Sequence, residues 1–199
     1  MADVTALKIE LADLGAQTEM GFRESLRSGA RIRALASALE ALNGCDEPAR
    51  AAALLRGRWR LLYSNFGFDR ETNLGRLTFN VLPRTEVTVE EMFQEVDPAN
   101  GHYDNVISYV DADGVPGMVV MVGAYLAVED ARIDIGFNQV LQTGPAGQVR
   151  LAIDSDRIPP LASDITYLDD SFRLHRSSTG NLYMFERMDE APMRWARDA

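Results

Sequence analysis

The feature that most constrains this chain is a change in its hydrophobic period at Gly57. Before this residue, apolar side chains recur at the three- and four-residue spacing of amphipathic helices. After it, apolar and polar residues alternate, beginning with Trp59, Leu61 and Tyr63, which the alternation places on one face of a strand. No rhythm of alternating strands and helices follows, so the sequence predicts a mainly β fold with N-terminal helices.

The first 56 residues predict three helices. The first covers residues 3 to about 26 and ends at a break at Ser28-Gly29, and the second ends at Asn43-Gly44. A short third helix is expected between Asp46, which can cap it, and Gly57. The apolar stripes of the two longer helices are Val4, Leu7, Leu11, Leu14, Ile32, Leu35, Leu39 and Leu42. Such stripes need an apolar surface to pack against.

Turn residues divide the rest of the chain into about nine short strand candidates. They cover residues 57–65, 74–81, 85–96, 103–111, 118–128, 133–141, 149–153, 172–176 and 182–187. Strand 85–96 changes phase at Glu90-Glu91, which indicates a β-bulge. Strand 118–128 is apolar on both faces, so we expect one face to line an interior and the other to receive the helices.

This series of strands predicts an antiparallel up-and-down β-barrel packed by two or three helices. A barrel of about this many strands can enclose one small ligand. We expect a single domain over residues 1–199, with a helical region at 1–56, the barrel at 57–188 and a polar tail at 189–199.

The last part of the chain reads as a β-hairpin. Phe172 and Leu174 alternate with Arg173 and His175, which is typical of a half-buried strand, and Ser177 opens the turn. The wording of this segment is specific: Thr-Tyr-Leu-Asp-Asp, then Arg-Leu-His-Arg, then Gly-Asn-Leu-Tyr-Met-Phe. It closely resembles the C-terminal signature of the plastid lipid-associated protein family, the plastid fibrillins, although that family usually has Gly where this chain has Ser177.

The resemblance extends to the N-terminal region, where Leu-Glu-Ala-Leu-Asn precedes a Pro-containing segment, whereas residues 66–130 match only loosely. It implies a lipocalin-like barrel and an association with lipids or other hydrophobic small molecules. In the lipocalin pattern, a Trp after the first Gly of the barrel closes its floor and an Arg of the last strand lies across the ring. Trp59 and Arg187 occupy those positions, so we expect them to close the barrel by stacking.

Composition excludes several other classes of protein. The chain of 199 residues is 46% hydrophobic, enough for a core, and its net charge of −10 argues against nucleic acid as a partner. The single cysteine, Cys45, excludes an internal disulfide. Nineteen of the twenty basic residues are Arg, which indicates a GC-rich, bacterial genome. With no spanning apolar run and no signal peptide, a cytoplasmic location is expected.

The sequence contains no pattern for nucleophilic, nucleotide or metal chemistry. There is no Gly-x-Ser-x-Gly and no phosphate-binding loop, and the two histidines, His102 and His175, lie too far apart to suggest zinc, so we expect no cofactor and no metal. His175 remains an alternative candidate as a single haem ligand. Asp169 and Asp170 could form an acid–base pair, but capping a turn and pairing with nearby arginines suits adjacent residues better.

We therefore predict a non-catalytic protein that binds a fatty acid, isoprenoid, quinone or pigment. The candidate ligand-binding residues are Arg173, Arg176, Tyr63, Tyr167, Phe137 and Tyr183. The arginines and Tyr167 would hold a polar head group, with Arg187 and Tyr63 taking that role if Arg173 points outward. Phe137, Tyr183 and Trp59 would line the interior.

Two alternatives stay open: an interaction protein with a filled barrel that acts through its helices, and an enzyme for a lipophilic substrate. Residues 1–60 are close to neutral, and four arginines cluster near the expected helix junction: Arg23, Arg27, Arg31 and Arg33. This cluster could touch an anionic membrane surface, or it could be an ordinary solvated helix face.

Overall fold

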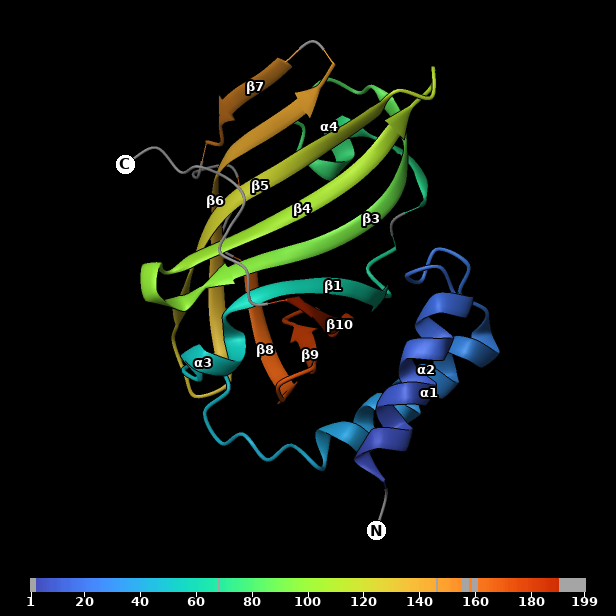
Figure 1. The fold of residues 1–199 in the computed structure, drawn as a ribbon, viewed down its shortest axis with the longest axis vertical. Helices are drawn as coiled ribbons and strands as arrows, with labels where there is room; N and C mark the ends of the chain where they lie inside the picture. Colours follow the sequence, from blue (N-terminus) through green and yellow to red (C-terminus); the bar gives the residue numbers. More distant parts are fainter. Residues whose placement is uncertain (1–2, 68, 146, 155–157, 159–160, 190–199) are drawn as a thin grey trace.

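The computed structural model describes residues 3–67, 69–145, 147–154, 158 and 161–189 and shows an antiparallel barrel. Eight strands close it in the order β1-β10-β9-β8-β6-β5-β4-β3, with β3 pairing back onto β1 (Figure 1). Their bounds are Gly57–Ser64 (β1), Glu86–Asp97 (β3), His102–Asp111 (β4), Pro116–Ala127 (β5), Arg132–Gly144 (β6), Leu161–Leu168 (β8), Phe172–Ser177 (β9) and Leu182–Asp189 (β10). Two further strands lie outside the closed ring: β2 (Glu71–Asn73) pairs with β3, and β7 (Gly147–Ala152) pairs with the end of β6. The predicted barrel class is confirmed.

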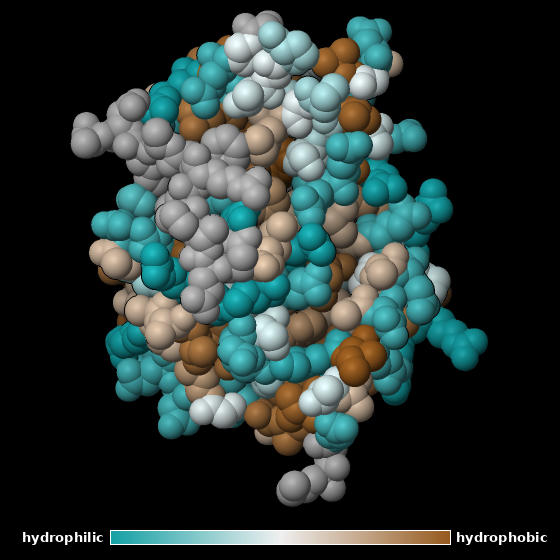
Figure 2. All heavy atoms as spheres, viewed as in Figure 1, coloured by the Kyte–Doolittle hydropathy of each residue, from teal (hydrophilic) through white to brown (hydrophobic). Residues whose placement is uncertain are grey.

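Two long helices pack side by side against one side of this barrel. They are α1 (Val4–Gln17) and α2 (Leu26–Glu40), and Figure 1 shows the pair beside β1, β9 and β10. Short helical segments follow at α3 (Ala52–Leu55), α4 (Leu74–Leu77) and η1 (Pro98–Asn100). No helix among the described residues is long and apolar enough to cross a membrane. Hydrophilic side chains cover most of the face seen in Figure 2, with hydrophobic ones in separate patches.

The helix boundaries differ from those expected, and hydrogen bonds to side chains explain two of the differences. The helix predicted to reach residue 26 ends at Gln17, because the Thr18 hydroxyl bonds back to Leu14 and Gly15 and the following residues reverse direction. Ser28 is not part of a break. It stands at the third position of α2 and completes a capping box with Ser25. The third helix begins only at Ala52, without a side-chain cap, so Asp46 does not cap it.

Two strand predictions have opposite outcomes. The bulge in strand 85–96 is confirmed, because the register with β4 shifts between Val89 and Glu91. The strand expected at residues 74–81 is wrong. This segment begins with α4, whose first turn is capped by Asn73 through an oxygen that accepts the backbone N–H of Arg76 at 2.9 Å.

The strands beneath the helices are buried on both faces. On β9, Phe172 and Leu174 pack against α1 and α2, while Arg173 and His175 point into the barrel and are 0% and 2% exposed. The prediction that this strand is half-buried was therefore wrong, because Arg173 and His175 face the interior. On β1 the register shifts between Leu61 and Tyr63, so Tyr63 leaves the face of Trp59 and joins the cluster under the helices.

The helices do not cover β5, contrary to the expectation from its two apolar faces. One face of β5 contributes Val119 and Met121 to the interior core. The other contributes Val120 and Val122 to a separate cluster with side chains of β3, β4 and β6. The cluster under the helices instead draws its strand residues from β1, β8, β9 and β10.

Candidate ligand cavity

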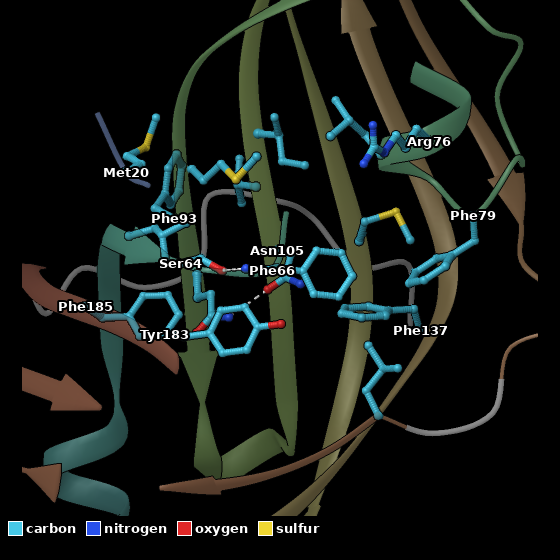
Figure 3. Close-up of a pocket in the computed structure, with 18 of the residues that line it drawn as sticks. Met20, Ser64, Phe66, Arg76, Phe79, Phe93, Asn105, Phe137, Tyr183 and Phe185 are labelled. Atoms are coloured by element: carbon cyan, nitrogen blue, oxygen red, sulfur yellow. Dashed lines mark hydrogen bonds between the residues drawn. The ribbon is translucent and has the colours of Figure 1, made fainter. Parts of the chain in front are cut away.

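The barrel contains a cavity of about 210 Å³ that is lined mainly by apolar side chains (Figure 3). Most of the lining comes from the strands of the barrel, and the rest comes from the turn after α1 and from the segment between β1 and β3. Seven aromatic residues contribute to it: Phe22, Phe66, Phe79, Phe93, Phe137, Tyr183 and Phe185. Aromatic rings supply large apolar contact areas, so the lining suits a hydrophobic occupant.

The mouth of the cavity is mainly apolar, although the half-exposed Arg76 also lines the cavity. Phe66, Phe79 and Leu161 line the cavity and are 48%, 42% and 42% exposed. Phe79 and Leu161 also border a shallower groove of about 640 Å³ that continues to Leu151 on β7. Phe79 adopts a positive φ of 52°, a conformation that costs a bulky residue energy, and its ring packs 6.2 Å from that of Phe137.

Amide side chains from β3 and β4 provide part of the polar lining, and Ser64 and Arg76 also contribute to it. Gln94 donates through Nε2 to Asn105 Oδ1 at 3.0 Å, and both residues line the cavity. The Gln94 oxygen accepts the Tyr103 hydroxyl at 2.7 Å and also accepts Arg173 Nη2. The Tyr183 ring also lines the cavity, and burial raises the pKa of its hydroxyl to about 12.

Arg173 is fully buried next to the Gln94 amide. Its guanidinium carbon lies 4.7 Å from the ring centroids of Trp59 and Phe185, so it is held by two aromatic rings. Burial lowers the pKa of Arg173 to about 10, which still leaves it charged at neutral pH. Its Nε and Nη1 atoms have no hydrogen-bond partner, and no carboxylate of the described residues lies within 4.0 Å of the group.

Trp59 and Arg187 lie together beside Arg173. The guanidinium carbon of Arg187 is 4.3 Å from the centroid of the Trp59 ring, and the Trp59 indole N–H donates to Leu55 O at 2.9 Å. Arg187 also donates to the backbone carbonyls of Leu54 and Arg56, which connects β10 to α3. These contacts of Trp59 and Arg187 connect β1, β10 and α3.

The structure divides the candidate ligand-binding residues into two groups. Phe137 and Tyr183 line the cavity, and Arg173 lies in the interior behind Gln94. Three others lie outside the cavity, on the helix-covered side. Arg176 pairs with Glu40 at 2.7 Å, the Tyr63 hydroxyl donates to Glu24 at 2.7 Å, and the Tyr167 hydroxyl donates to Asp169 at 2.6 Å.

His175 and Asp169 are held by contacts with neighbouring residues, and the backbone carbonyl of Asp170 accepts Arg187 Nε. The Nδ1 atom of His175 lies 3.2 Å from Ser163 Oγ, and burial together with the charge of Arg173 lowers the pKa of His175 well below its usual range. Asp169 accepts the backbone N–H groups of Ser171 and Phe172 and the Lys8 ammonium. It is therefore a capping and ion-pairing residue. Among the described residues, no group of three His, Cys, Asp or Glu could hold a metal ion.

The arginine cluster near the helix junction is largely neutralised within the molecule. Arg23 pairs with Glu19 at 2.9 Å, Arg31 with Glu10 at 2.7 Å and Arg33 with Glu24 at 3.2 Å. These pairs reduce the positive charge that the helices can offer to an anionic surface.

Gln94 and Asn105 are among the cavity residues that the sequence interpretation missed. The sequence did contain evidence for Gln94, because after the bulge it alternates in step with Met92 and Val96 and so falls on the same, inward-facing side of the strand. Asn105 similarly stands between Tyr103 and Ile107, which both face the interior. A polar residue at an inward position of a barrel strand was the available clue.

Comparison with known proteins identifies the family of this chain. The PAP_fibrillin family model matches residues 5–186. The chain belongs to the PAP/fibrillin family. It is 26% identical to the "Plastid-lipid-associated protein 6, chloroplastic" of Arabidopsis thaliana over 92% of this chain and 70% of that protein. It is 24% identical to the "Plastid-lipid-associated protein, chloroplastic" of Citrus unshiu over 93% of this chain and 68% of that protein. The resemblance seen in the closing hairpin is thus confirmed.

Proposed function

We propose that this fibrillin-family barrel is a non-catalytic binding or carrier protein for a hydrophobic small molecule. The observation that carries the proposal is the aromatic-lined cavity of about 210 Å³ whose mouth is mainly apolar. The names of the two plant relatives describe lipid association, which favours the same class of ligand.

The size of the cavity limits what can enter it. An apolar cavity of about 150 Å³ accommodates benzene, so this cavity, at about 210 Å³, has room for a substituted ring or for part of an acyl or isoprenoid chain. A longer chain would leave through the mouth and lie in the groove beside Leu151 and Leu161. Burial of the chain would supply the affinity, at about 25 cal/mol for each Å² of apolar surface removed from water.

The chemistry of the polar lining favours binding over catalysis. Gln94 and Asn105 carry amides, which do not exchange protons near neutral pH. The pKa of Tyr183 is raised to about 12 by burial, so this phenol stays protonated and is a poor general base. These groups can orient a ligand through hydrogen bonds.

The proposal is tested by titrating the protein with N-phenyl-1-naphthylamine, a neutral dye that fluoresces in apolar sites. The native protein should give saturable fluorescence that a hydrophobic chain molecule such as 1-decanol displaces. Ile107→Trp replaces an aliphatic side chain of the cavity lining with a bulky indole and should weaken dye binding at least about tenfold. Ile9→Trp is the matched control, since Ile9 is 58% exposed on α1, and it should leave dye binding unchanged.

The two outcomes separate the candidate functions. Equal dye binding by the native protein and by Ile107→Trp would show that the dye sits elsewhere. Absence of saturable binding would favour the alternative of a filled barrel that acts through its helices.

A further inference from the structure

The direction of the hydrogen bonds in the cavity wall is fixed by one buried arginine. A guanidinium can only donate hydrogen bonds. The oxygen of the Gln94 amide, and not its nitrogen, must therefore face Arg173 Nη2. The Tyr103 hydroxyl donates to the same oxygen at 2.7 Å, which holds the amide in this orientation.

The orientation of the Gln94 amide determines that of the Asn105 amide. Because the Gln94 oxygen is engaged, its nitrogen faces Asn105 and donates to Oδ1 at 3.0 Å. The Nδ2 group of Asn105 is then the part of that amide left without an acceptor among the described residues, on a side chain that lines the cavity. Figure 3 shows this amide and the Tyr183 side chain in the same part of the pocket. The polar lining is thus biased toward donors.

The charge of this region points the same way. Arg173 is 0% exposed, its hydrogen-bond partner Gln94 is neutral, and its Nε and Nη1 atoms are unpartnered. No carboxylate of the described part of the chain pairs with it. A buried cation without a counter-ion is costly, so an anion in the adjacent cavity would be favoured.

We propose that the ligand is a lipophilic carboxylate whose head group accepts hydrogen bonds from Asn105 and Gln94 and is favoured by the positive charge of Arg173. The inference rests on the proposed function and adds the chemical class of the ligand. Arg173 acts here as a positioning residue, because it orients the two amides and supplies charge from behind the cavity wall.

The test compares two probes of equal chain length, decanoic acid and 1-decanol, as displacers of N-phenyl-1-naphthylamine at pH 7.5. The native protein should bind decanoate at least about tenfold more tightly than decanol, as expected for a charge-assisted hydrogen bond. Arg173→Met keeps a long apolar side chain and removes the charge and the donors. It should bring the ratio of the two affinities close to one, with decanol affinity changed less than about threefold.

Further variants separate positioning from general damage. Arg31→Met removes an exposed arginine of α2 that lies outside the cavity and should preserve the ratio. Arg173→Lys retains the charge and should recover part of it. Asn105→Leu removes the cavity-facing donor without touching Arg173 and should lower the ratio even if Arg173→Met fails to fold.

Each outcome decides between the two proposals. Equal affinity of the native protein for decanoate and decanol, or a ratio that Arg173→Met and Asn105→Leu leave unchanged, would overturn the inference while the proposed function stands. Failure of both probes to bind the native protein would overturn the proposed function as well.

Discussion

The ion pair between Lys8 and Asp169 fastens α1 to the loop between β8 and β9, and its contribution to stability should depend on pH. Asp169 Oδ2 accepts the Lys8 ammonium at 2.7 Å and the Tyr167 hydroxyl at 2.6 Å, while Oδ1 accepts two backbone N–H groups. Burial alone would raise the pKa of Asp169. The hydrogen bonds from Lys8, Tyr167 and the backbone outweigh it and lower the pKa from 3.8 to about 2.

The size of the effect follows from this shift. A decrease in the pKa of Asp169 from 3.8 to about 2 corresponds to ~2.5 kcal/mol of stability at neutral pH. The Asp169 side chain is 27% exposed, so solvent screening reduces the expected value to about 1–2 kcal/mol. Because the folded-state pKa lies below the unfolded-state value, the contribution is complete above pH 3.8 and is lost as the pH falls toward 2.

Urea unfolding of the native protein and of Asp169→Asn, at pH 7 and at pH 3, measures this contribution. Asparagine keeps an oxygen for the two backbone N–H groups and removes the charge. At pH 7 the variant should be less stable by about 1–2 kcal/mol, and at pH 3 roughly half of that difference should remain. In a double-mutant cycle, Lys8→Met should show a coupling energy with Asp169→Asn of about 1 kcal/mol.

The reasoning would be refuted if the difference between the native protein and Asp169→Asn were the same at both pH values. A coupling energy near zero would refute the role of Lys8 and leave the turn-capping bonds as the source of the stability.

Three further predictions concern the barrel, and urea unfolding with intrinsic fluorescence checks each. Arg187→Met removes the cation stacked on Trp59 and the donors to the carbonyls of Leu54 and Arg56, and should destabilise the fold by roughly 2–4 kcal/mol. A urea midpoint equal to that of the native protein would contradict this prediction. Gly123→Ala would place a Cβ atom 2.7 Å from both Phe137 Cδ1 and Tyr103 O and should lower the free energy of unfolding by about 1–3 kcal/mol. Gly136→Ala is the control, because its Cβ would meet nothing within 4 Å and the variant should be close to neutral; similar losses of stability in the two variants would argue against close packing at Gly123. Phe79→Gly should be more stable than Phe79→Ala by about 1 kcal/mol, because Phe79 has a positive φ of 52°, and the reverse order would show that its backbone is not strained.

The fold class was predictable because its evidence is local. The change of period at Gly57 separates helices from strands, and the closing hairpin carries the family signature, which the match over residues 5–186 confirms. The bulge near Glu90 was visible for the same reason, as a break in alternation. In each case a few neighbouring residues decide the structure.

The directions of the key side chains were harder to predict, because they depend on tertiary packing. Hydrophobic alternation cannot tell which face of β9 is the interior when helices cover the outside. The sequence therefore left open whether Arg173 faces the lumen, and it did not predict that His175 is buried. The register shift before Tyr63 moves that ring to the outer face without any interruption of the apolar pattern. Arg176 could be placed only once its partner Glu40, on α2, was known.

The central claim is that the cavity holds a hydrophobic small molecule, and native mass spectrometry of the purified protein tests it most directly. We expect a stoichiometric adduct that is lost on unfolding, and organic extraction should release a lipophilic acid of matching mass. Ile107→Trp, prepared in the same way, should lack the adduct. A bare protein mass for the native chain, unchanged after incubation with fatty acids and isoprenoids, would contradict the account.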